Sequence, residues 1–255
     1  MQLTLSATEF EVAWGALRLG DLPLLFRVRI SRRGATEEER ERLVTSTMDG
    51  LRRRGLADGR GLRTDLADAL TVLARHRWAV DARLEFHREG RALGAATRSA
   101  AAIAMLDADT VTITSSTPYR LPADMAELAG DLPVRTGRSI NLSAHVLFTA
   151  ASRIGAGDPL ELADELVALG VPAGDARTLA AINAEMLGGG QFGVQVVDQD
   201  GTVCRAPRVV GFCDTHDCRW AQLRAEDWIT FVPAGSTQLA VMITDLLAEC
   251  GVRAG

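Results

Sequence analysis

Reactive side chains are most concentrated in the segment Cys213–Cys218, which holds two cysteines, two aspartates and a histidine. Such side chains can bind zinc, but a zinc site needs four ligands in a tetrahedron, commonly from two spaced pairs. No second pair accompanies this one, and the spacing of Cys204 and Cys250 demands no disulfide. A polar turn between two strands, with aspartates bound to nearby backbone, explains the composition without a metal. The segment therefore predicts a turn and no metal site, while a metal- or small-ligand-binding regulatory protein that uses it stays the alternative function.

The glycine-rich run Gly188–Gly193 matches the G-x-G-x-x-G pattern of dinucleotide-binding proteins. That pattern needs a strand before it and a helix after it, because the pyrophosphate lies at the N-terminus of the helix. Here the order is reversed, with a predicted helix before the glycines and a predicted strand after them. We therefore interpret the run as a glycine linker that ends a helix, and expect no cofactor.

No catalytic constellation can be recognised in the sequence. Neither G-x-S-x-G nor H-E-x-x-H occurs. The acidic run Glu37–Glu39 is explained as the first turn of a helix, where carboxylates favour the positive end of the dipole. None of the four histidines lies in a sequence motif typical of nucleophilic catalysis: His76, His87, His145 and His216. We therefore expect no enzymatic activity.

Composition limits the classes of protein further. The chain has 255 residues and 47% hydrophobic residues, enough for one large domain or two small ones with a real core. Its net charge is −5 and its basic residues, all arginine, form no concentrated basic face, which argues against nucleic-acid binding. The cluster Arg52–Arg54 closes a predicted helix, where cations meet the negative end of the dipole. No apolar run approaches the roughly 18 residues of a membrane helix, so we expect no membrane insertion and a cytoplasmic protein.

Capping patterns and periodicity locate the main elements. Ser6–Glu9 and Thr36–Glu39 match the capping box, and Asp158 followed by Pro159 is typical of a helix start. Pro23–Ile30 is predicted as a strand. From Ala79 the period changes to two, which indicates a strand with one solvated face. The expected faces are Val80, Ala82, Leu84 and Phe86 on one side and Asp81, Arg83, Glu85 and His87 on the other.

The order of predicted elements in the second half repeats that of the first. Gly55 and Gly170 both end helices, and Asp109 and Asp227 both precede strands, at offsets of 115 and 118 positions. We therefore predict an α/β protein of the α+β type, with a central antiparallel β-sheet flanked by helical bundles and an internal pseudo-two-fold duplication. Its halves would be residues 1–135 and 136–255, joined near Asp131–Asn141 into one body. Such a body favours a surface for a partner over a pocket for a reaction.

Aromatic residues gather in the second half. Phe212, Trp220, Trp228 and Phe231 lie on neighbouring predicted strands. Alternation favours burial of most of them, but any that is exposed would suit the anchoring of a partner helix. Phe212 and Trp220 are the candidate anchors.

Several segments together resemble the EspG family, the ESX (type VII) secretion-associated proteins of actinobacteria. They are Leu5–Phe10 with Trp14, Thr36–Arg40, Gly137–Ile140, Gly190–Gly193, Val210–Thr215 with Arg219–Trp220, and Asp227–Ala234. The resemblance covers essentially the whole chain, through the order and spacing of motifs that are individually weak. It implies a cytosolic chaperone without enzymatic activity. Such a chaperone binds the helical tip of a PE–PPE heterodimer or a similar helical ESX substrate and keeps it soluble before export.

The resemblance also implies where a partner binds. In such relatives the loop of an early hairpin and the C-terminal part of the molecule contact the partner. By position in the fold pattern, that loop is His87, Arg88, Glu89, Gly90 and Arg91. One departure is Cys218, where relatives commonly have glycine before the arginine of this turn. The sequence leaves open the identity of the partner and whether the chain is a monomer or a homodimer.

Overall fold

The backbone builds one large antiparallel sheet. The computed structural model describes residues 1–27, 36–86, 89–135, 137–154, 158–198 and 200–252. Within them, eleven strands form a single sheet in the order β1-β5-β4-β3-β2-β7-β9-β10-β11-β6, with β8 paired to β7 off this path, and every pairing is antiparallel. The strands are β1 (Gln2–Ser6), β2 (Trp78–Glu85), β3 (Glu89–Ala96), β4 (Ala101–Asp107), β5 (Thr110–Ser116), β6 (Ile140–Ser143), β7 (Gly188–Val197), β8 (Val203–Arg205), β9 (Val210–Asp214), β10 (Arg219–Ala225) and β11 (Trp228–Pro233).

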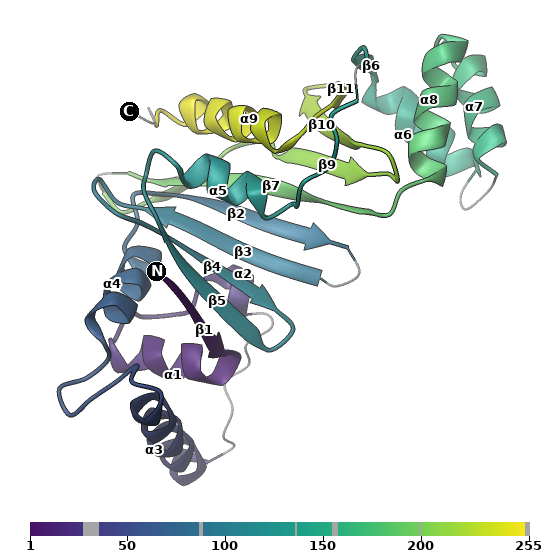
Figure 1. The fold of residues 1–255 in the computed structure, drawn as a ribbon. Helices are drawn as coiled ribbons and strands as arrows, with labels where there is room; N and C mark the ends of the chain where they lie inside the picture. The colour runs from purple at the N-terminus through teal and green to yellow at the C-terminus, as the bar shows by residue number, and fades with distance from the viewer. Residues whose placement is uncertain (28–35, 87–88, 136, 155–157, 199, 253–255) are drawn as a thin grey trace.

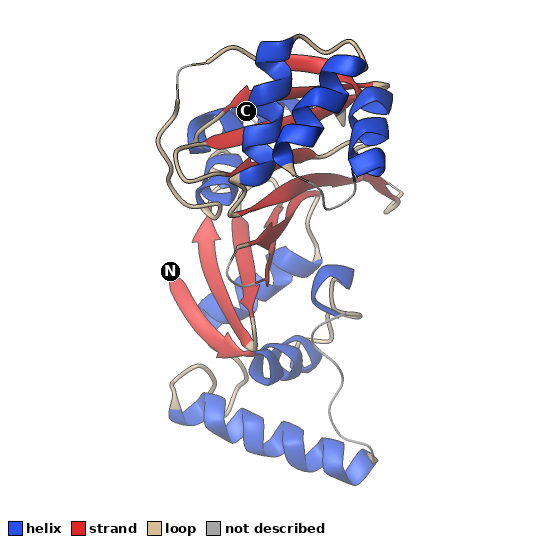
Figure 2. Cartoon of the chain, turned by 90° about the vertical axis from the view of Figure 1, so that its right-hand side faces the viewer, coloured by secondary structure: helices blue, strands red, loops and turns tan. Residues whose placement is uncertain are grey.

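The helices lie in three groups around this sheet. The described helices are α1 (Ala7–Ala16), α2 (Leu24–Arg27), α3 (Glu37–Arg53), α4 (Thr64–Ala74), α5 (Leu121–Glu127), α6 (Ala144–Ile154), α7 (Pro159–Ala168), α8 (Ala173–Ala184) and α9 (Ser236–Glu249). Helices α1, α3 and α4 lie at one end of the molecule and α6, α7 and α8 at the other (Figures 1 and 2). Helices α5 and α9 pack side by side over the middle. The predicted class, an antiparallel sheet flanked by helices, is confirmed.

Each helical group covers its own hydrophobic core. Phe10, Phe26 and Leu70 are fully buried in the core under α1, α2 and α4. Phe192 and Leu246 lie in a second core under α5 and α9, and residues of α6, α7 and α8 pack with β10 and β11 in a third. Full burial of one such side chain contributes roughly 1.5–3 kcal/mol, so each group is held to the sheet by its apolar face.

The strand order reads the same from either edge of the sheet. Each half contributes its first strand at the edge and then its last strands inward, so that β2 and β7 meet in the middle. Each half also has an equivalent backbone hydrogen bond. The Ala7 N–H donates to the Asp109 carbonyl at 2.8 Å, and the Ala144 N–H donates to the Asp227 carbonyl at 2.7 Å. The division into halves 1–135 and 136–255 stays a prediction, and this topology supports it.

Local signals at several helix ends are confirmed. The side chains of Ser6 and Thr36 accept hydrogen bonds from the N–H groups of Glu9 and Glu39, which completes both predicted capping boxes. Asp158 accepts a hydrogen bond from the Leu160 N–H at 2.8 Å. In the described part of the chain, no helix has the length and apolar character needed to span a bilayer.

Two sequence interpretations are wrong. The predicted strand Pro23–Ile30 is the short helix α2 at Leu24–Arg27, while residues 28–30 lie outside the described part. The fully buried Phe26 explains this, because a helical turn after Pro23 places its ring in the first core. The glycine run that was predicted to be a linker belongs to a strand, because β7 begins at Gly188. A Cβ on Gly190 would lie 2.5 Å from the Arg83 carbonyl oxygen. Close approach of neighbouring strands therefore explains this glycine.

Candidate partner-binding site

A row of polar residues crosses the middle of the sheet. In register, the row runs Arg91, Arg83, Gln191, Gly211 and Gln222 across β3, β2, β7, β9 and β10. Directly paired residues share one face of a sheet. At its ends the row reaches Leu106 and Phe231, which are buried in the first and third cores. The polar row therefore bridges a gap between two helix-covered cores. We call this gap the open face and define it by Arg83, Gln191, Gly211 and Gln222.

Strand β2 shows why this face is solvated. Val80, Ala82 and Leu84 are buried on the side of α5 and α9, whereas Arg83 and Glu85 are exposed on the other side. The predicted alternation is confirmed for these residues. Polar side chains at every second position leave this side without apolar groups to hold a helix, so the face stays available to a partner.

Two hollows open onto this face on either side of Arg83. One, of about 560 Å³, is lined by residues that include Leu24, Arg91 and Arg205. The other, of about 500 Å³, is lined by residues that include Met186, Leu187 and Gln222, and Arg83 lines both. Arg83 is thus part of both linings, and we call the two hollows together the depression.

Exposed apolar side chains border the depression. Leu24 is 67% exposed on α2, and Met186 and Leu187 are 54% and 52% exposed between α8 and β7. Outside the linings of the two hollows, Phe148 on α6 is also exposed, and the Arg224 guanidinium carbon lies 5.6 Å from the centre of its ring. Large apolar side chains gathered at one solvated depression are typical of a protein–protein interface.

Charge on the open face is only partly neutralised within the chain. Arg205 pairs with Asp81 at 2.6 Å, and Arg91 pairs with Glu89 at 2.6 Å. Arg83 has no ion pair among the residues that the structure describes. The face therefore offers a guanidinium to a carboxylate of a partner, beside an apolar rim.

The predicted hairpin loop adjoins this surface. His87 and Arg88 lie outside the described residues. Glu89, Gly90 and Arg91 begin β3, and Arg91 belongs to the polar row. A Cβ on Gly90 would lie 2.5 Å from the Met105 Cε, the flexible end of a side chain that can shift. The partner-binding role of the loop stays a prediction.

The two aromatic candidates do not reach the surface. Phe212 is 5% exposed and stacks on Phe192, with 5.6 Å between ring centres. Trp220 is 9% exposed in the third core. Helices that cover both parts of the sheet bury these rings, so neither offers surface for direct anchoring of a partner. Of the four aromatic residues in this region, only Trp228 is exposed.

Sequence reasoning missed the apolar rim. Met186 and Leu187 lie after the end of α8 and before the glycines of β7. Two large apolar residues at a helix end, next to a glycine run, are a weak signal that could have drawn attention to this position. Leu24 and Phe148 carry no such signal, because each belongs to an amphipathic pattern that also predicts burial.

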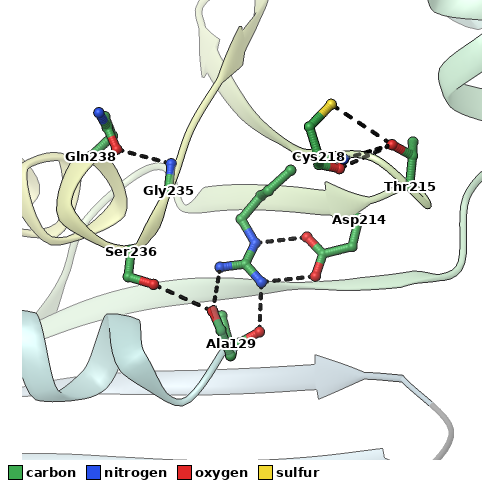
Figure 3. A network of polar contacts seen from close by, with 9 residues as sticks. Ala129, Asp214, Thr215, Cys218, Gly235, Ser236 and Gln238 are labelled. Atoms are coloured by element: carbon green, nitrogen blue, oxygen red, sulfur yellow. Dashed lines mark hydrogen bonds and ion pairs between the residues drawn. The ribbon is translucent and has the colours of Figure 1, made fainter. Parts of the chain in front are cut away.

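The cysteine-containing turn is structural. Arg219 is fully buried and forms a bidentate ion pair with Asp214, with bonds of 2.6 and 2.8 Å. Its guanidinium also donates to the carbonyls of Ala129 and Gly130 after α5, and the Ser236 hydroxyl donates to the Gly130 carbonyl (Figure 3). The turn therefore ties α5 to the C-terminal strands.

The Cys213 thiol of this turn is not set up for metal binding or nucleophilic chemistry. Burial, together with the nearby Asp214 carboxylate and Cys218 thiol, raises the pKa of the Cys213 thiol to about 11. The thiolate is the metal ligand and nucleophile, so this thiol stays inert near neutral pH. Among the described residues, no group of three or more His, Cys, Asp or Glu side chains could hold a metal ion.

His76, beside the open face, predicts a pH effect on stability. Burial lowers the pKa of His76 below the ordinary value of 6.5. Its Nδ1 donates a hydrogen bond to the Leu73 carbonyl, which leaves Nε2 to accept a hydrogen bond from the Gln195 side-chain amide. Because the unfolded chain binds this proton more readily, stability is complete above pH 6.5 and falls as the pH drops towards the folded-state value. We expect His76→Asn to show a smaller loss of unfolding free energy between about pH 7.5 and about pH 5.5 than the wild type. The exposed His145→Asn is the control, and equal slopes for wild type and His76→Asn would contradict the assignment.

Comparisons with known proteins agree with this architecture. The sequence model of the EspG family matches residues 6–245. The chain belongs to the EspG family. A solved structure of the Mycobacterium tuberculosis type VII secretion system chaperone EspG5 in complex with the PE25–PPE41 dimer has a similar fold, with a TM-score of 0.74 at 15% identity over 97% of this chain and 96% of that chain. No curated protein matches the chain. The resemblance in the sequence and the predicted fold are therefore confirmed.

Proposed function

We propose that this EspG-family protein is a chaperone of a type VII secretion system that binds a PE–PPE heterodimer and keeps it soluble before export. The observation that carries the proposal is the open face, a polar depression with an exposed apolar rim, in a chain whose fold matches EspG5, which is solved with PE25–PPE41. Covering the apolar tip of a helical partner with this rim would remove both apolar surfaces from water.

The chemistry of the face supports recognition by docking. Apolar side chains at the rim supply contact area, and Arg83, which has no ion pair within the described residues, supplies a charged group that a carboxylate can neutralise. The hairpin residues His87–Arg91 would contact the partner from one side and Met186 with Leu187 from the other.

We further propose that the protein acts in the cytoplasm and without catalysis. A chaperone that protects a secretion substrate must meet that substrate before export. The inert Cys213 thiol and the neutral, backbone-bonded His76 supply neither a nucleophile nor a positioned base on the open face.

The proposal predicts a stable complex with a PE–PPE pair encoded in the same genome. After co-expression and affinity capture through the PE subunit, we expect the protein to co-elute with the pair in one size-exclusion peak of 1:1:1 stoichiometry. Mass photometry or multi-angle light scattering gives the mass. Separate elution from every PE–PPE pair and every small helical ESX substrate of that genome would overturn the proposal.

A further inference from the structure

A third cavity lies at the other end of β2, away from the hairpin loop. It has a volume of about 550 Å³, within the range of small-molecule sites. It opens between the β3–β4 turn, the segment after β5 and the C-terminal end of α9. Its lining consists of Arg77, Trp78, Thr97, Arg98, Thr117, Pro118, Tyr119, Val196, Val197, Gly251 and Val252.

The polar part of this lining consists of hydrogen-bond donors without a carboxylate. Arg77 and Arg98 contribute two guanidinium groups, and neither has an ion pair within the described residues. The hydroxyls of Thr117 and Tyr119 add two more donors. By contrast, both hollows of the open face contain acidic residues, such as Asp81 and Glu85. In a chain of net charge −5, a cavity whose described lining has no acidic side chain, and whose two arginines have no ion pair there, favours an anion.

In the C-terminal half of the chain, the position equivalent to this cavity holds an ion pair between two residues of the chain itself. The Thr97 and Thr215 N–H groups donate to the carbonyls of Ala100 and Cys218, both at 2.9 Å, so the two turns match. Beside the second turn, Asp214 pairs in register with Arg219, whose guanidinium binds the end of α5 (Figure 3). Beside the first turn, the corresponding register pair is alanine with alanine, at positions 96 and 101. Within the described residues, this register pair therefore supplies no carboxylate to the arginines near the end of α9.

The remaining walls are apolar and partly aromatic. Trp78, Pro118 and Val252 line the cavity, and Tyr119, 75% exposed, stands at its side. Flat apolar walls beside cationic groups suit a ligand that joins an anionic group to an apolar body. The carbonyls of Leu247 and Ala248 at the end of α9 accept bonds from Val252 and Gly251, so they do not face the cavity as free acceptors.

We propose that this cavity binds a small organic oxyanion, a phosphate or a carboxylate carried on an apolar body. Arg77 and Arg98 bind the oxyanion, and Tyr119 with Pro118 contacts the body. The cavity and the hairpin loop lie at opposite ends of the eight-residue strand β2, roughly 25 Å apart at about 3.3 Å per residue. A ligand bound here would therefore not contact the partner-binding surface.

The test compares ligands that differ in one part. Phenyl phosphate and benzoate carry the same ring with different anions, benzamide lacks the charge, and inorganic phosphate lacks the ring. By isothermal titration calorimetry up to about 10 mM, a range suited to ligands this small, we expect phenyl phosphate or benzoate to bind. The better of the two identifies the anion, and benzamide and inorganic phosphate should bind at least roughly tenfold more weakly.

Variants place the ligand in this cavity. Arg77→Gln and Arg98→Gln should each weaken binding roughly tenfold, as expected for loss of a charge-assisted hydrogen bond. Arg177→Gln, at an exposed arginine on α8, is the matched control and should leave affinity unchanged. All three variants should keep the thermal unfolding midpoint and the PE–PPE complex. Absence of binding by both ring anions, equal binding of benzamide, or unchanged affinity in both cavity variants would overturn the proposal and leave the chaperone function untouched.

Discussion

Replacement of Arg219 by alanine is expected to lower the free energy of unfolding by about 3–5 kcal/mol, because it leaves the buried Asp214 carboxylate unpaired. The Arg219 side chain is 0% exposed and that of Asp214 is 7% exposed. The guanidinium also satisfies the carbonyls of Ala129 and Gly130, and its carbon lies 4.8 Å from the centre of the Phe212 ring. One substitution therefore removes four hydrogen bonds and a ring contact. Urea denaturation followed by circular dichroism measures the loss.

A double-mutant cycle separates the unpaired charge from the lost packing. The paired variant Asp214→Ala/Arg219→Ala reproduces the alanines found at positions 96 and 101 in the other half. Because it leaves no isolated charge, we expect a loss well below the sum of the two single variants. Arg120→Ala, in an exposed pair with Asp124, should change stability by no more than about 0.5 kcal/mol. An Arg219→Ala variant as stable as Arg120→Ala would contradict this role.

The role of Arg219 shows where sequence reasoning reaches its limit. Periodicity identified the strands around it, and the segment Cys213–Cys218 was correctly interpreted as a turn. An arginine beside a polar turn gives no sign of burial, since arginine is mostly exposed in proteins. Its burial depends on the end of α5, which lies 89 positions earlier in the chain and meets the turn only in the folded sheet.

The open face was partly predictable for a related reason. Alternation in β2 predicted that Asp81, Arg83 and Glu85 share a solvated side, because the period of two is local. Alternation cannot say which residues of β9 and β10 a helix covers, and for this reason Phe212 and Trp220 were candidates although both are buried. The exposure of Met186 and Leu187 depends on where α8 ends relative to β7, which is a tertiary property.

Met186→Asp together with Leu187→Asp is expected to weaken binding of the PE–PPE partner at least roughly 100-fold. The two side chains are about half exposed in the free protein, so their replacement should change folding stability by no more than about 0.5 kcal/mol. In the complex, the same positions would carry two charges into an apolar contact, and unpaired charges buried at an interface cost several kcal/mol. Titration calorimetry or biolayer interferometry with the purified heterodimer measures the affinity.

Controls for this variant use apolar residues that are equally exposed elsewhere. Leu160 on α7 and Val241 on α9 are 74% and 55% exposed, and neither lines a hollow of the open face. Leu160→Asp and Val241→Asp should therefore leave the affinity unchanged. Equal weakening by controls and test variant would show that general surface charge governs binding, and would remove Met186 and Leu187 from the interface.

The variant Arg83→Glu tests the charged part of the open face in the same binding assay. This charge reversal should weaken binding of the partner most at low ionic strength, because salt screens an exposed ion pair.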